Sequence, residues 1–138
     1  MQLKLSTDYA IRIILYLATT NQVVPSLELS TRLGIPQSFV FKINKKLKSV
    51  GLIKTHLGSQ GGVSLALPAE HITLYQIISI MESTTKINRC LEDDEYCSRF
   101  AIFYCPVRKF YCKLQNDIEV SLASMTIASL LEKTEKEE

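Results

Sequence analysis

Apolar residues in the first third of the chain recur at the spacing of helices that bury one face. Between residues 7 and 18 they return every three or four positions, which predicts a buried first helix. A second, short helix is predicted for residues 26–33 and ends at Gly34, because glycine readily takes the left-handed conformation that terminates helices. The apolar stripe of residues 37–50 predicts a third helix.

The segment after the third helix has the pattern of a β-hairpin. Two short runs of strand-forming residues, 52–55 and 63–67, flank Gly58, Gly61 and Gly62. Glycine supplies the positive φ angles that a tight connection between antiparallel strands requires. Helix, short helix, turn, helix and hairpin in this order predict a winged helix-turn-helix, a mainly α fold with a small β wing.

The second half of the chain predicts two further helices with an irregular segment between them. Thr73 is a favourable N-cap for the apolar stretch that follows it. No regular period is visible in residues 85–106, but a helical pattern returns at residue 107 and continues for roughly 27 residues. Such a long helix finds little of its own small domain to pack on, so we expect it to bury its stripe in a homodimer.

These elements divide the chain into three parts. Residues 1–84 are the predicted winged helix-turn-helix domain, residues 85–106 are a cysteine-rich loop, and residues 107–138 are a dimerisation helix with a polar tail. No apolar run is long enough to span a membrane and no signal peptide is visible, so we expect a cytoplasmic protein. We also find no catalytic constellation, so an enzyme is not expected.

The net charge of +2 is modest, but the charges are unevenly distributed. No acidic residue lies between Glu28 and Glu70. That stretch holds these basic residues: Arg32, Lys42, Lys45, Lys46, Lys48 and Lys54. A basic block in a nearly neutral protein indicates an anionic partner, with double-stranded DNA favoured over the alternative of a solvated lysine face.

The third helix is the predicted DNA-reading helix. Gln37 and Ser38 lie at its N-terminal end, where a helix-turn-helix meets base edges, although both residue types also serve as helix caps. Lys42, Lys45 and Lys46 are expected to neutralise phosphates, which fixes register without reading sequence. The hairpin tip supplies further candidate DNA contacts, namely His56, Ser59, Gln60 and Gly61.

All four cysteines of the chain, Cys90, Cys97, Cys105 and Cys112, follow one another at the spacing C-x6-C-x7-C-x6-C. Structural zinc usually takes cysteines two to four residues apart, and no such pair is present. Iron–sulfur clusters accept thiolates from loops with wider separations. An iron–sulfur cluster is therefore favoured, while zinc, a thiol-redox pair and plain burial stay open.

The chain resembles the bacterial iron–sulfur winged-helix transcriptional regulators, a family that includes IscR, NsrR and RirA. The resemblance lies in TDYAIRIILYLA, IPQSFVFKINKKLKSVGLI, GSQGG, HITLYQIISIMES and the cysteine segment before a helix ending in MTIASLL. It implies a homodimeric regulator, usually a repressor, whose [2Fe-2S] or [4Fe-4S] cluster senses redox state, nitric oxide or iron. The alternative is a zinc-stabilised or thiol-redox regulator, or a protein-interaction module, without a cluster.

The resemblance also implies which side chains hold the cluster. In that family three cysteines bind the cluster, and a threonine near the end of the long helix follows the third cysteine at a characteristic distance. Counting back by that distance from Thr126 reaches Cys105, so the resemblance implies the ligands Cys90, Cys97 and Cys105. Some members use a histidine three residues later, but that place holds Arg108, which cannot ligate. Others use an acidic residue near the N-terminus of the partner subunit, and Asp8 matches that place, with Cys112 as the local rival.

The wing departs from the family pattern. An arginine commonly precedes the first wing glycine and a tyrosine follows the last, but this chain has Leu57 and Val63 there. A wing arginine suits a narrow minor groove, so we expect DNA binding with an altered sequence preference.

Overall fold

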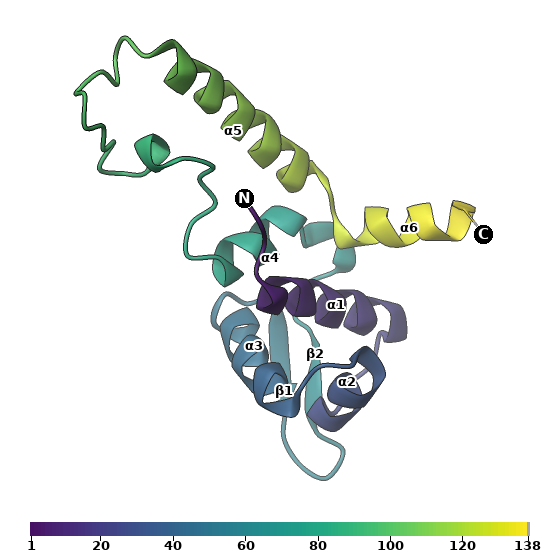
Figure 1. The fold of residues 1–138 in the computed structure, drawn as a ribbon. Coiled ribbons are helices and arrows are strands. Elements are labelled where there is room, and N and C mark those ends of the chain that lie inside the picture. Colours follow the sequence, from purple (N-terminus) through teal and green to yellow (C-terminus); the bar gives the residue numbers. More distant parts are fainter. Residues whose placement is uncertain (138) are drawn as a thin grey trace.

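The computed structural model describes residues 1–137 and shows a winged-helix body with an arm that projects from it (Figure 1). The predicted helices and strands of the body are confirmed to within two residues at each end. The elements are α1 (Leu5–Thr20), α2 (Ser26–Leu33), α3 (Gln37–Ser49), β1 (Ile53–His56), β2 (Gly62–Leu65), η1 (Ala69–His71), α4 (Leu74–Met81), η2 (Arg89–Leu91), α5 (Pro106–Ser124) and α6 (Ile127–Glu137).

Helix α1 is the centre of the hydrophobic core. It contacts α2, α3, α4 and α6, and its inner face is fully buried. Because Ile13 and Leu17 lie one turn apart, they face the same neighbours. Burial of each such side chain stabilises the fold by about 1.5–3 kcal/mol. The core therefore fixes α3, the predicted DNA-reading helix, on a rigid support.

The turn between α2 and α3 is held by local hydrogen bonds. Gly34 is left-handed, with φ 65° and ψ 38°, as its position after the helix predicted. The backbone N–H of Ile35 donates to the Ser30 carbonyl at 3.1 Å, and the Ser30 hydroxyl donates to the Ile35 carbonyl at 2.6 Å. Ile35 is buried, so the turn is anchored to the core as well.

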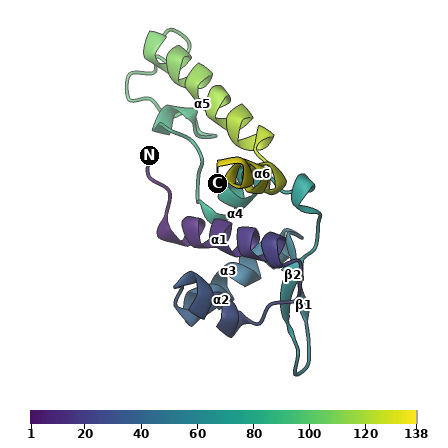
Figure 2. The same ribbon diagram turned by 90° about the vertical axis from the view of Figure 1, so that its right-hand side faces the viewer.

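The wing is a two-stranded antiparallel hairpin that extends away from the helices (Figure 2). Its base is tied to the segment before α2, because Val24 and Val63 exchange two backbone hydrogen bonds of 2.8 and 2.9 Å. A Cβ atom at Gly62 would collide with the Val24 carbonyl oxygen. Glycine is therefore required there by close approach of two backbones.

The prediction of one continuous C-terminal helix is wrong. Helix α5 ends at Ser124, Met125 is extended, and α6 begins at Ile127. The break follows from pairing between distant segments, since Leu74 donates to the Met125 carbonyl and Ile127 donates to the Ile72 carbonyl. Ile127 is fully buried, so α6 belongs to the core of the body rather than to the arm.

The arm consists of α5 and the long connection that leads to it from α4 (Figure 1). Gln115 is the buried residue of α5. Its Oε1 accepts from the Ile87 N–H at 2.9 Å, and its Nε2 donates to the Thr85 carbonyl at 2.9 Å and to Glu119 at 3.0 Å. This side chain fastens the start of the connection to α5.

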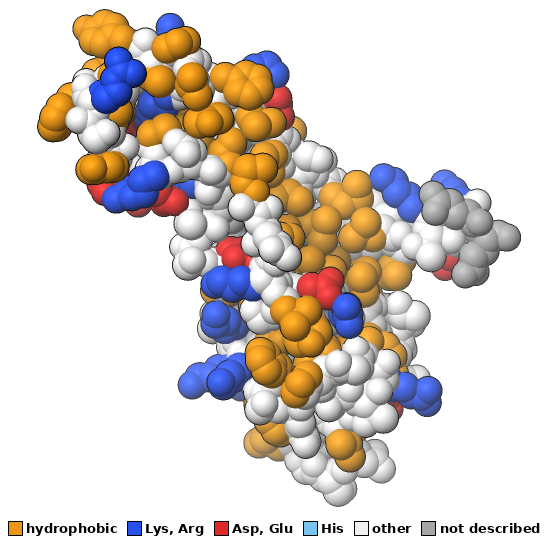
Figure 3. All heavy atoms as spheres, in the orientation of Figure 1, with side chains coloured by type: hydrophobic (Ala, Val, Ile, Leu, Met, Phe, Trp, Pro, Cys, Tyr) orange, Lys and Arg blue, Asp and Glu red, His pale blue; other side chains and the backbone are white. Residues whose placement is uncertain are grey.

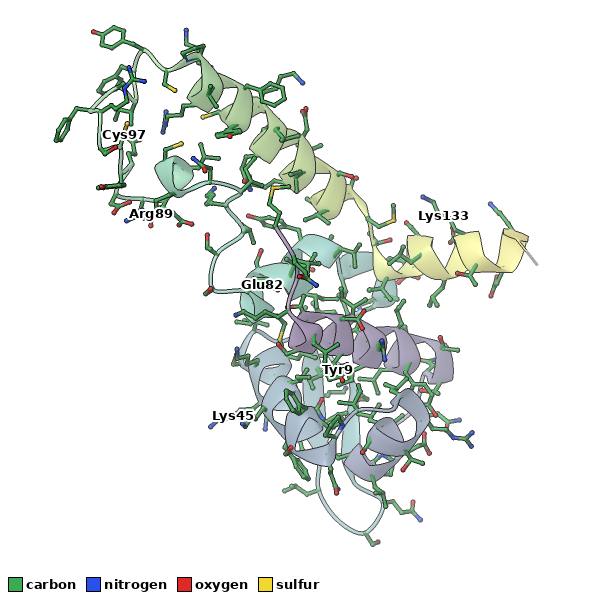
Figure 4. All side chains as sticks on the ribbon, in the orientation of Figure 1. Tyr9, Lys45, Glu82, Arg89, Cys97 and Lys133 are labelled. Atoms are coloured by element: carbon green, nitrogen blue, oxygen red, sulfur yellow. The ribbon has the colours of Figure 1, made fainter. Side chains whose placement is uncertain are left out.

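Glu82 fastens the first helix to the end of α4. The N-cap of α1 is Lys4, which offers no side-chain cap. Glu82 supplies one from a distant element, because its Oε1 accepts from the Lys4 N–H at 2.8 Å and the Thr7 hydroxyl at 2.6 Å (Figure 4). Burial raises the pKa of Glu82, but these bonds and the charges of Lys4 and Lys46 outweigh burial and lower it overall.

Replacement of Glu82 by alanine is expected to lower the free energy of unfolding by about 1–3 kcal/mol, because a charged hydrogen-bond acceptor is lost. The pKa is lowered in the folded state, so the stabilisation is present above the ordinary carboxyl pKa and is lost as pH falls through the lowered one. Urea unfolding of wild type and Glu82→Ala from pH 7 to pH 3 measures this. The two curves should converge in acid. Glu70→Ala, at an exposed position, is the control, and an equal loss there would refute the assignment.

Candidate nucleic-acid interface and cysteine cavity

The N-terminal end of α3 leaves two polar side chains free. Gln37 and Ser38 are exposed, and neither makes a side-chain hydrogen bond within the described residues. The N-cap position is Pro36, which provides no side-chain cap. Gln37 and Ser38 therefore do not cap α3 in the structure. Both side chains are free to contact DNA.

The lysines of α3 are exposed. Lys42, Lys45 and Lys46 are all solvent-accessible, and Lys45 points away from the body (Figure 4). None of the three forms an ion pair within residues 1–136. Unpaired ammonium groups on one helix produce a positive surface that attracts phosphates.

The predicted wing contacts do not share one environment. Ser59 and Gln60 are exposed at the tip, beside Leu57, which is 94% exposed. His56 is half-buried instead, and its Nε2 lies 2.8 Å from the Ser64 hydroxyl on the opposite strand. Gly61 acts through its backbone, because a Cβ there would collide with the His56 carbonyl. The tip, rather than His56, is the part of the wing most open to a partner.

Three of the four cysteines line one cavity in the arm. Cys90, Cys97 and Cys105 surround a space of about 310 Å³ between η2, the following loop and the start of α5. Figure 4 places Cys97 in that loop beside Arg89. Cys112 is exposed further along α5 and does not line the cavity, and neither does Asp8. The structure thus groups the three cysteines at one cavity, apart from Cys112 and from Asp8 of the same subunit.

Each of the three sulfur atoms is approached by N–H donors. The Asn88 amide lies 3.1 Å from Cys90 Sγ, and the Arg108 N–H lies 3.4 Å from Cys105 Sγ. Backbone N–H groups, that of Ala101 foremost, hold the pKa of the Cys97 thiol below its ordinary value. Such donors stabilise thiolates, which are the form that ligates metals, so this cavity fits the donor set of a thiolate-bound group.

Arg108 also helps to shape the cavity. Its Nε donates to the Cys90 carbonyl at 3.2 Å, and its Nη2 lies 3.5 Å from Glu95. The sequence had marked this position only as unable to ligate. In the structure it joins η2 to the start of α5, and no local pattern could have indicated that because the two segments are distant in sequence.

Asp8 is already paired on α1. Its carboxylate lies 2.7 Å from Arg12, whose other nitrogen donates to the Leu33 carbonyl at 3.4 Å. Arg12 also lies over the Tyr9 ring. That ring packs edge-on against Phe39 of α3, with 6.0 Å between the two ring centroids. Within the described residues, no three His, Cys, Asp or Glu side chains lie close enough together to hold a single metal ion.

Residues 3–133 match the model of the Rrf2 family, described as iron-dependent transcriptional regulators. The chain belongs to the Rrf2 family. An Rrf2 protein of this kind regulates transcription by binding DNA and is not an enzyme. None of the helices in residues 1–137 is long and apolar enough to cross a membrane.

Several known proteins are similar to this Rrf2-family chain. Protein aau3 of Rhizobium meliloti (strain 1021) is 33% identical over 96 residues, which cover 69% of this chain and 62% of that protein. IscR of T. potens has a TM-score of 0.78 at 21% identity, over 100% of this chain and 91% of that one. CymR (YrzC), the global cysteine regulator of B. subtilis, also has a TM-score of 0.78, at 18% identity over 96% of this chain and 98% of that one. The two structures show the fold that this chain shares.

Proposed function

We propose that this Rrf2-family protein is a homodimeric, cytoplasmic repressor whose iron–sulfur cluster controls its affinity for DNA. The observation that carries the proposal is the cavity lined by Cys90, Cys97 and Cys105. A cluster held there would supply redox and ligand-exchange chemistry that responds to oxidants, nitric oxide or iron supply. The iron dependence in the family description supports this choice of cofactor.

The arrangement of the thiols favours a cluster over zinc. Tetrahedral zinc needs four ligands that converge on one ion at about 2.0–2.3 Å. Here three cysteines line a cavity of about 310 Å³, and no three His, Cys, Asp or Glu side chains of the described residues lie close enough together for a single ion. A polynuclear cluster is larger and takes thiolates from several sides, so it suits such a space better.

The fourth ligand remains a choice between Asp8 and Cys112, and we propose Asp8 of the partner subunit. Asp8 is bonded to Arg12, which reaches the end of α2 and, through Tyr9, the recognition helix α3. A ligand that takes the Asp8 carboxylate competes with Arg12 for it. When the cluster binds or leaves, the Asp8–Arg12 pair would therefore break or form, and the contacts of Arg12 with α2 and of Tyr9 with α3 would change. Such a change would alter the spacing between the α3 helices of the two subunits.

We propose that the dimer forms through the arm. Figure 3 shows hydrophobic side chains gathered on the arm. Seven large side chains of the arm are more than half exposed: Tyr96, Phe100, Phe103, Tyr104, Val107, Phe110 and Val120. Monomeric proteins rarely leave such contiguous apolar surface in water. A second copy of the arm would cover it and bring Asp8 of one subunit toward the cysteines of the other.

Removal of lysines from α3 tests the DNA-binding role. Lys45→Ala and Lys46→Ala are each expected to weaken binding to all DNA sequences alike, and to reduce the slope of log affinity against log salt by about one unit. Fluorescence anisotropy with two unrelated duplexes at four salt concentrations measures both effects. Wild-type slopes in both variants would remove α3 from the interface.

A thiol-redox regulator without a cluster is the second candidate. It is favoured by Cys97, whose backbone N–H donors lower the thiol pKa, and by the fold shared with the cysteine regulator CymR. Iron and sulfide analysis separates the two, because this second mechanism needs neither element.

A further inference from the structure

A run of four acidic residues lies between the first two cysteines of the cavity: Glu92, Asp93, Asp94 and Glu95. Three of the four are bound by side chains of other segments. The Thr84 hydroxyl donates to Glu92 at 2.5 Å. Arg89 pairs with Asp94, and Arg108 pairs with Glu95 at 3.5 Å. Asp93 makes no ion pair within residues 1–136. The run is therefore tied to the arm by specific contacts, with Asp93 as a natural point of comparison.

The pair between Arg89 and Asp94 has a fixed, two-pronged geometry. The two Nη atoms of Arg89 donate to the two carboxylate oxygens of Asp94, one to each. The guanidinium group also lies over the Tyr96 ring, 5.4 Å from the ring centroid. Most surface ion pairs contribute little, but a bidentate arginine–carboxylate pair is the stronger kind, and contact with an aromatic face adds to it. Arg89, Asp94 and Tyr96 thus act as one unit, called the clamp below.

The clamp joins the neighbours of two cavity cysteines. Arg89 directly precedes Cys90, and Tyr96 directly precedes Cys97. Both Arg89 and Tyr96 line the cavity (Figure 4 shows Arg89 and Cys97). Between them Glu95 has a left-handed backbone, with φ 46°. A non-glycine residue persists in that conformation only where its surroundings hold it. Because the clamp spans this turn, its loss would let the turn relax and the two cysteines move apart.

We infer that Asp94 is a positioning residue of the cysteine cavity, because it holds Arg89 against Tyr96. The clamp in turn fixes the separation of Cys90 and Cys97 and keeps two large side chains over that side of the cavity. For a bound cluster, whose presence rests on the proposed function, the clamp would slow the entry of water and oxidants. It therefore governs how long a cluster lasts in air rather than which thiols hold it.

Iodoacetamide labelling of the apo protein tests the clamp without any cluster. In Asp94→Asn, Cys90 and Cys97 should be alkylated about three- to tenfold faster than in wild type, because the loop opens more often. Cys112 is exposed outside the cavity and should keep its rate. Mass spectrometry of the labelled peptides resolves each site. Asp93→Asn is the matched control, with an equal charge change at the next residue. Equal rates in Asp94→Asn and wild type would overturn the inference.

Two conservative variants separate the geometry of the clamp from its charge. Arg89→Lys keeps the positive charge but loses the planar fork that binds both carboxylate oxygens and lies on the ring. It should therefore behave like Asp94→Asn, and wild-type protection in Arg89→Lys would contradict the clamp. Asp94→Glu keeps both acceptor oxygens, so its labelling rates should lie nearer to wild type than to Asp94→Asn. The reverse order would also contradict it. None of these residues belongs to the core, so every variant should fold.

The lifetime of the cluster in air provides a second readout. Asp94→Asn purified without oxygen should hold wild-type amounts of iron and sulfide, since no ligand is changed, but should lose its visible absorption about three- to tenfold faster in air. Asp93→Asn should decay at the wild-type rate. Faster labelling of Asp94→Asn in a protein that never holds iron and sulfide would keep the clamp and refute the proposed cofactor. Unchanged labelling and unchanged lifetimes would refute the clamp and leave the cluster in place.

Discussion

Replacement of Cys90, Cys97 or Cys105 by alanine is expected to remove most of the iron and sulfide from anaerobically purified protein. The three thiols line one cavity and each is approached by N–H donors, so the loss of any one opens the site to water. The visible absorption of the cluster should disappear in all three variants. Retention of iron and sulfide by all three would refute the ligand assignment.

Cys112→Ala and Asp8→Ala serve as comparisons for these variants. Cys112 is exposed outside the cavity, so its replacement should leave the iron and sulfide content unchanged. Asp8→Ala should still assemble a cluster but lose it faster in air. If Cys112→Ala destroys the cluster while Asp8→Ala changes nothing, the site belongs to one chain, and the link to α1 proposed here is wrong.

Phe110→Asp is expected to convert the dimer to a monomer. Phe110 is 60% exposed on α5, within the apolar surface that we assign to the dimer. A symmetric dimer would bury the introduced carboxylate twice without a partner, at a cost of several kcal/mol each time. Analytical ultracentrifugation at micromolar concentration should show a folded monomer, whose circular dichroism is unchanged because Phe110 is not part of the core.

Lys113→Ala is the matched control for the dimer. Lys113 lies on the same helix, is exposed and pairs with Asp117, so its loss should leave the dimer intact. A monodisperse Phe110→Asp dimer would show that the arm is not the interface. Truncation of α5 and α6 is a poorer experiment, since it removes Ile127 from the core and would unfold the body.

The body of the molecule could be predicted because its signals are local. Helix periods, the glycine after α2 and the Thr73 cap each act within a few residues, and the structure shows all of them. Thr73 even forms a complete capping box with Gln76. The break after α5 could not be predicted from periodicity. The apolar pattern continues through it, and the break depends on pairing between Thr73 and Thr126.

The break did leave two local traces. Thr126 accepts from the Ser129 N–H at 3.1 Å, so it caps α6 in the manner of an ordinary helix start. A threonine followed three residues later by a serine is a weak signal. It does not predict that a helix ends there unless the pairing with the Thr73 segment is already known. Ile127 is the other trace, since an apolar residue there suits a core as well as a dimer stripe.

The candidate site was predictable only in part, because some of its residues act through contacts between segments that are distant in the sequence. Resemblance to the family grouped Cys90, Cys97 and Cys105, and the structure brings these three to one cavity, although their role as ligands stays a prediction. Arg108 was not identified, because its bond to the Cys90 carbonyl joins distant segments. The Arg89–Asp94 pair was not identified either, since an arginine near a run of acidic residues is also typical of a solvated surface.

DNA affinity measured with and without the cluster tests the central claim most directly. Protein purified without oxygen is assayed for iron and acid-labile sulfide, and half is then stripped to the apo form. Both forms are titrated onto the same DNA at one salt concentration. We predict comparable amounts of iron and sulfide, and affinities that differ by about 5- to 150-fold. Protein without sulfide, or equal affinities of the two forms, would contradict a cluster-controlled regulator.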